Sequence, residues 1–167
     1  EHLLAPGHRL GVKRLADGAV PVDTLEAKVA ALRKALPMLH AAGLTSVMDA
    51  SVAEAELEVL ASLARSGGLT LDVTTALEDE ADGKGDWLPK LEDQRQRYAG
   101  LHNLRVDTAK VFVDGVMEFP TQSAAPLEPY TPVEGQGRSD TGNLYVDPEA
   151  FGRLATELDR RGFNVHA

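Results

Sequence analysis

One lysine lies inside the most apolar strand-like run of the sequence, Leu104 to Asp114. Two-residue alternation predicts that Ala109, Val111 and Val113 share one face of that strand. Thr108, Lys110 and Phe112 then point the other way. A charged amine is costly to bury, so this lysine must be paired, reach solvent, be neutral or be chemically modified. A neutral amine can add carbon dioxide, and the resulting carbamate has two oxygens that can bridge two divalent cations.

The alternative is an ion pair between Lys110 and Asp72 or Asp49 on neighbouring predicted strands. On spacing alone both readings stay open, and the ion pair is the commoner use of such a lysine.

A histidine closes the last predicted strand, where its ring would face the same sheet edge as Lys110. His166 could therefore bind a metal, although a hydrogen-bonded core histidine is the commoner role after an apolar run. Asp49 and Asp114 also close predicted strands, and each could accept a proton or cap the following turn. Capping is favoured for Asp114 because Gly115 follows it.

The longest loop of the chain, residues 115–147, contributes a second set of candidates. Glu118, Phe119 and Thr121 could line a substrate pocket there, or they could be solvated loop residues. A loop of this length in a compact domain is usually functional.

These candidates depend on helices and strands that alternate along the chain. The predicted order is helix, strand, helix, strand, helix, strand, long loop, helix, strand, with strands at 44–49, 69–75, 104–114 and 163–166. The predicted helices cover 23–42, 54–63, 87–98 and 148–161, with Asp23 or Thr24 as the N-cap of the first and Asp147 as that of the last. An interruption or kink is predicted at Pro37, a stop at Gly43, and an acidic loop at 78–86. The pattern predicts one α/β domain, residues 1–167, with four βα units and a parallel sheet. In such folds ligands meet the carboxyl ends of strands.

Composition excludes several classes of function. The 167 residues, with 43% hydrophobic and 26% charged side chains, are ordinary for one globular domain. A formal charge of −9 disfavours nucleic-acid binding. No apolar run reaches the roughly 20 residues that span a bilayer, so no membrane partner is expected. The lack of cysteine rules out disulfides and thiolate metal sites and fits a cytoplasmic protein.

Three stretches in order along the chain resemble amidohydrolase family 3, in the amidohydrolase superfamily. Residues 108–118, followed by Thr121 and Pro129-Tyr130, resemble the lysine strand of that family, which includes N-substituted formamide deformylases. Residues 43–49 look like its second barrel strand, and residues 162–167 look like the start of its fifth.

The resemblance implies a partial (β/α)8 TIM barrel comprising strands 2 to 5. It also implies that Lys110 is a carboxylated lysine bridging two divalent metals and that His166 is a direct ligand. The implied reaction is hydrolysis of an amide-like C–N bond in a small molecule by metal-activated water. Zinc suits the implied ligands, with manganese, iron or cobalt also open.

The remaining ligands of the family have no matching positions, so an inactive fragment that binds metal weakly or not at all is expected. The chain opens at Glu1 without methionine and closes at Ala167 directly after a predicted strand, as an excised internal segment would. Unclosed sheet edges predict self-association of such a fragment. The competing hypothesis is a non-catalytic α/β binding or interaction domain with the same residues in structural roles.

Overall fold

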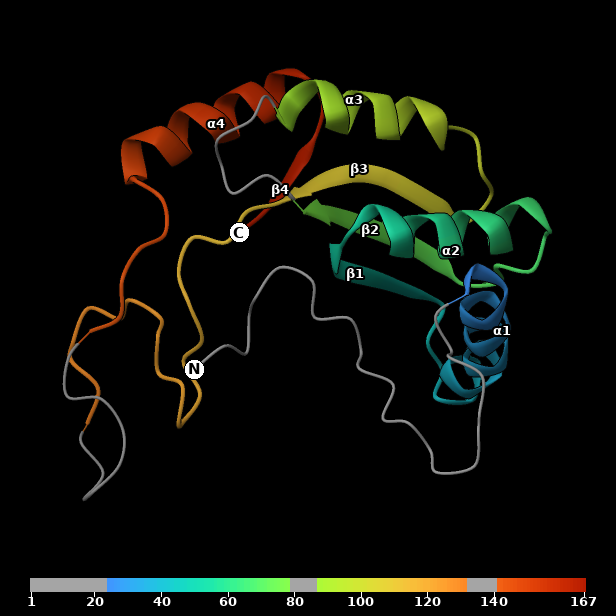
Figure 1. The fold of residues 1–167 in the computed structure, drawn as a ribbon, viewed down its shortest axis with the longest axis horizontal. Helices are drawn as coiled ribbons and strands as arrows, with labels where there is room; N and C mark the ends of the chain where they lie inside the picture. The colour runs from blue at the N-terminus through green and yellow to red at the C-terminus, as the bar shows by residue number, and fades with distance from the viewer. Residues whose placement is uncertain (1–23, 79–86, 132–140) are drawn as a thin grey trace. The chain divides into compact units, whose positions relative to one another are not determined.

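Helices and strands alternate along the chain in the computed structural model, which describes residues 24–78, 87–131 and 141–167 (Figure 1). The elements are α1 (Leu25–Ala41), β1 (Ser46–Val52), α2 (Glu54–Arg65), β2 (Asp72–Glu78), α3 (Trp87–Arg97), β3 (Leu104–Lys110), α4 (Pro148–Arg160) and β4 (Asn164–His166). The strands form one sheet in the order β1-β2-β3-β4, with a helix in each crossover. This arrangement confirms the predicted α/β class, its four-stranded parallel sheet and a partial barrel.

The chain divides into two compact units, residues 1–108 and 109–167. In the first unit β1 and β2 pair in parallel, with Ser46 opposite Asp72 and Asp49 opposite Thr75. The amide of Val73 donates to the carbonyl of Asn103 at 2.9 Å, which joins β2 to the start of β3. Helix α2 runs along the β1–β2 pair in Figure 1.

Helix α2 supplies much of the buried core of this unit because its apolar residues recur every three or four positions. Leu57, Ala61 and Leu63 are 0% exposed. Its acidic first turn and Arg65 in its last turn complement the helix dipole.

A polar cluster fastens α2 to α3. Tyr98 donates its hydroxyl proton to Glu58 over 2.9 Å, and Arg65 lies above the Tyr98 ring at 5.6 Å from the centroid. Arg97 donates to Glu54 at 2.9 Å. Hydrogen bonds and opposite charges therefore link α2 to the C-terminal end of α3.

Helix α1 begins at one of the two predicted caps, because the Thr24 hydroxyl accepts a hydrogen bond from the amide of Ala27 at 3.2 Å. It continues through Pro37, where an interruption or kink was predicted. Gly43 follows in a left-handed conformation with φ 81°, as the stop signal predicted.

The second unit contains the end of β3, the long loop, α4 and β4. Asp147 caps α4 by accepting a hydrogen bond from the amide of Ala150 at 2.8 Å. Leu158 is 0% exposed, and its carbonyl accepts a hydrogen bond from the amide of Phe163 at 2.9 Å, just before β4.

Several predicted strand boundaries were wrong. Strand β1 covers Ser46–Val52 rather than 44–49, and β2 ends at Glu78 rather than at 75. Strand β2 begins at Asp72, three residues later than predicted, although Leu69 and Leu71 are buried. Strand β3 ends at Lys110, four residues earlier than predicted. Apolar side chains indicate burial, whereas a strand also requires backbone pairing. The prediction therefore added apolar residues that lie outside the paired region to the start of β2 and the end of β3. Most of the acidic loop predicted after β2 lies outside the described residues.

Candidate functional site

Lys110 and His166 are the last residues of two neighbouring strands, β3 and β4. The amide of Val111 donates to the carbonyl of His166 at 2.9 Å. In a parallel ladder this bond places the residue before the donor opposite the acceptor residue, so Lys110 and His166 are register partners. Register partners lie about 4.8 Å apart and direct their side chains to the same face. The two predicted metal ligands are thus brought together at the carboxyl edge of the sheet.

Both side chains are half-buried, and the Lys110 amine has an aromatic neighbour. Its Nζ lies 4.8 Å from the ring centroid of Phe112, which is a cation–π distance. Phe112 is 49% exposed. Sequence reasoning placed this ring on the same face as the lysine but did not include it in the site. An aromatic residue two positions beyond a strand-end lysine was the available signal.

The chemistry of this pair fits two ligands of a divalent metal. A carbamate on Lys110 would supply oxygen, and His166 would supply a ring nitrogen, a set that zinc accepts. Within the described ranges, no group of three or more His, Cys, Asp or Glu side chains is placed to hold a metal ion. The pair therefore fits part of a site that needs further ligands.

The long loop follows β3 directly and has a tightly packed base. Asp114 accepts a hydrogen bond from the amide of Ala125 at 3.0 Å, which links the start of the loop to a later part of it. The predicted capping of the turn at Gly115 stays a prediction. The amide of Ser123 donates to the carbonyl of Val116 at 2.8 Å. A Cβ added to Gly115 would lie 2.7 Å from the backbone of Ser123, so only glycine fits this contact.

The predicted substrate-binding residues occupy a turn in this loop. The amide of Gln122 donates to the carbonyl of Glu118 at 3.0 Å, and the Phe119–Pro120 peptide bond is cis. Glu118, Phe119 and Thr121 all expose their side chains. They are available to a ligand, and their role in binding one stays a prediction.

The carboxyl edge of the first unit carries polar residues that sequence reasoning did not single out. Glu78 is the last residue of β2 and accepts a hydrogen bond from the hydroxyl of Ser51 near the end of β1. The predicted end of β2 fell at Thr75, which assigned Glu78 to a loop and hid its position. Correct strand ends would have shown it.

Asp49, a predicted strand-closing carboxylate, lies within β1 just before an irregularity in its pairing with β2. Partial burial of its carboxyl group raises its pKa, the Ser51 amide hydrogen bond opposes this, and the charge of Glu56 adds to the increase. Asp49 and Asp72 belong to the first unit and Lys110 belongs to the second. An ion pair between Lys110 and either aspartate stays a prediction.

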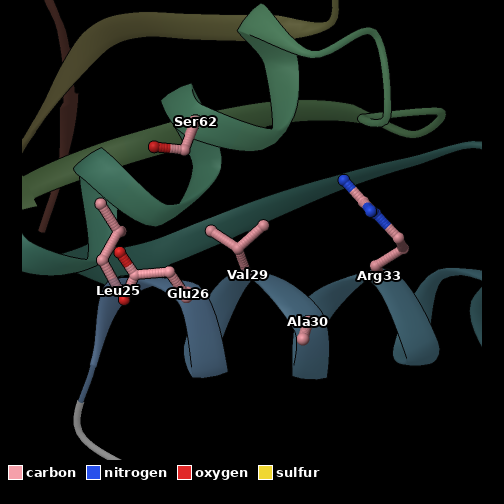
Figure 2. Close-up of a pocket in the computed structure, with 6 residues that line it drawn as sticks. All are labelled: Leu25, Glu26, Val29, Ala30, Arg33 and Ser62. Carbon is pink, nitrogen blue, oxygen red and sulfur yellow. The ribbon is translucent and has the colours of Figure 1, made fainter.

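A surface hollow of about 350 Å³ lies between α1 and α2 (Figure 2). Figure 2 shows Val29 and Arg33 of α1 pointing toward the helix that carries Ser62. The hollow is lined by helix side chains and holds none of the candidate ligands. None of its lining residues belongs to a strand.

A parallel sheet with helical crossovers and ligand-type residues at its carboxyl edge defines a segment of a (β/α) barrel with a candidate metal centre. The sequence model of the amidohydrolase family matches residues 4–167. The chain therefore belongs to the amidohydrolase family.

Two solved structures have the same fold. An uncharacterized metal-dependent hydrolase from Pyrococcus horikoshii OT3 is 24% identical, with a TM-score of 0.63 over 86% of this chain and 27% of its own. One from Pyrococcus furiosus is also 24% identical, with a TM-score of 0.63 over 85% of this chain and 28% of its own. The chain thus spans about a quarter of the length of these hydrolases. A comparison with curated proteins found no match. Among the helices described, none has the length and apolar character needed to cross a membrane.

Proposed function

We propose that this chain supplies part of a binuclear metal site to an enzyme that hydrolyses amide-like C–N bonds in small molecules, as N-substituted formamide deformylases do. The observation that carries the proposal is the register pairing of Lys110 with His166 at the carboxyl edge. Membership of the amidohydrolase family and the likeness to metal-dependent hydrolases support it.

In this proposal the Lys110 amine, once neutral, attacks the carbon of carbon dioxide and loses a proton. A new N–C bond forms, and the product is a carbamate with two oxygens. Lys110, through this carbamate, and His166, through a ring nitrogen, would hold two divalent metals, most suitably zinc, together with further ligands. When bound, the metals would lower the pKa of a water molecule and polarise the scissile carbonyl. Glu118, Phe119 and Thr121 would contact the substrate from the loop.

The isolated chain is proposed to be inactive and to bind metal weakly or not at all, because two ligands do not complete a binuclear site. It would also self-associate, since β1 and β4 are the two edges of the sheet. Light scattering on the isolated chain tests this, and a monodisperse monomer at high concentration would contradict it.

A second candidate is a non-catalytic α/β domain, which the contact between the Lys110 amine and the Phe112 ring favours. In that reading the ring satisfies the lysine, and no modification is needed. The two candidates differ in whether the full-length protein carries metal.

The deciding experiment measures metal content by mass spectrometry on the full-length protein, purified without chelator. Wild type should carry about two metals, and Lys110→Ala should lose one or both. Lys34→Ala is the matched control, because Lys34 is exposed on α1. A ¹³C carbamate signal after incubation with labelled bicarbonate should appear in wild type and vanish in Lys110→Ala. Metal-free wild type would refute the proposal.

A further inference from the structure

We infer that Phe112 forms an apolar wall of the substrate site and that the substrate carries a flat apolar group, such as a phenyl ring, which packs on it. This inference rests on the proposed function. It starts from the position of the ring, which lies 4.8 Å from the Lys110 amine and is 49% exposed. A single exposed aromatic is not unusual on a protein surface, so the case depends on how this one is held.

The backbone is fixed on both sides of Phe112. The amide of Val111, immediately before it, donates to the carbonyl of His166 at 2.9 Å. The carbonyl of Val113, immediately after it, accepts a hydrogen bond from the amide of Tyr145 at 2.8 Å. Val111 is 8% exposed and anchors the chain in the core. The backbone that carries the ring is therefore held beside the candidate ligands, and little backbone entropy would be lost when a ligand packs against the ring.

The charges of the chain segment that contains Phe112 favour an apolar ligand over an anionic one. From residue 111 to residue 131 the sequence contains no lysine or arginine. The charged side chains in that stretch are acidic, and Asp114 is already engaged by the amide of Ala125. Residues 111–131 therefore offer a ligand an aromatic ring and no positive charge, and Lys110 is the cation that precedes them. Stacked or edge-to-face rings are worth about 0.5–1.5 kcal/mol beyond their area burial.

A pair of metal-chelating probes isolates this contact. Acetohydroxamate and benzohydroxamate chelate a metal through the same group and differ only in a methyl against a phenyl. Their Kd values are measured by titration calorimetry on the full-length metal-loaded protein. Wild type should prefer benzohydroxamate, and Phe112→Ala should reduce that preference about 2- to 10-fold with the acetohydroxamate Kd unchanged. Phe112→Leu should fall between them, and Met117→Ala, on the same loop and 68% exposed, should match wild type.

The possible outcomes separate this inference from the proposed function. Wild type without metal would refute both. Metal-loaded wild type whose preference survives in Phe112→Ala would overturn only the inference. A lower Tm of Phe112→Ala with unchanged preference would also overturn it, because the ring would then be covered by another part of the full-length protein. Loss of metal in Phe112→Ala and Phe112→Leu alike would assign the ring to holding Lys110 instead.

Discussion

Replacing Gly142 by alanine should dismantle the base of the long loop. A Cβ at this position would lie 2.0 Å from the carbonyl oxygen of Ser123 and 2.1 Å from that of Ala124. Both neighbours are backbone atoms, so no side-chain rotation can relieve the overlap. One of the two segments must move, and the 2.9 Å hydrogen bond from the Gly142 amide to the Ala124 carbonyl is then lost.

The expected decrease in the free energy of unfolding is the sum of the overpacking cost and the lost hydrogen bond. Overpacking costs about 1–3 kcal/mol, and a lost hydrogen bond about 1 kcal/mol. Gly142→Ala should therefore lower the free energy of unfolding by about 2–4 kcal/mol if the loop unfolds with the protein. Gly152 is the matched control, because it lies in α4 and a Cβ there would meet nothing within 4 Å. Gly152→Ala should raise stability by about 1 kcal/mol through helix propensity.

Two measurements on the full-length protein test this reasoning. Urea unfolding should give Gly142→Ala a lower midpoint concentration than wild type and Gly152→Ala a higher one. Hydrogen–deuterium exchange should show that Gly142→Ala loses protection at the Ser123 and Ala124 amides, which both donate to the carbonyl of Val116. A Gly142→Ala variant that is as stable as Gly152→Ala and keeps that protection would refute the proposed packing of the loop.

Three further predictions concern stability and metal. Asp147→Ala should lower the unfolding free energy by about 1 kcal/mol, measured by urea unfolding, because α4 loses its cap. Glu58→Gln should lower the free energy of unfolding at neutral pH. Burial acts to raise the pKa of Glu58, but the hydrogen bonds from Arg65 and Tyr98 outweigh it and hold this pKa below its ordinary 4.5. Its stabilisation is present above pH 4.5 and is lost as pH falls below that value, so the two proteins should converge in acid unfolding curves. Chelator dialysis should lower the Tm of the full-length protein, while Lys110→Ala should show a smaller shift.

The order of the elements could be predicted from the sequence because helical periodicity and β-branched runs are local signals. Asp23 or Thr24 was predicted to cap α1 and Asp147 to cap α4. Thr24 and Asp147 both accept the expected amide hydrogen bond. Lys110 and His166 were predicted to meet because parallel strands end at one edge. That step needed only the alternation of strands and helices, not the exact boundaries.

The exact strand ends and the contacts within the loop required information that residue patterns do not contain. Strand ends depend on which backbone groups are paired, so β2 was placed three residues too early and Glu78 was assigned to a loop. The proximity of Phe112 to the Lys110 amine depends on how the chain turns after β3 ends. The close approach of Gly142 to Ser123 is a contact across a long stretch of loop, which no local pattern encodes.

Position in the sheet also bears on the proposal that Lys110 and His166 are two ligands of a site that this chain only partly supplies. Lys110 and His166 come from adjacent strands, and one backbone hydrogen bond from Val111 fixes their spacing. Ligands from strands outside this chain would be held only after the barrel closes. Metal binding would then depend on closure, and the binding free energy would stabilise the closed barrel. If the proposed function is right, the Lys110–His166 pair alone is an incomplete set of ligands, and metal affinity should be higher in the full-length protein than in this chain by itself.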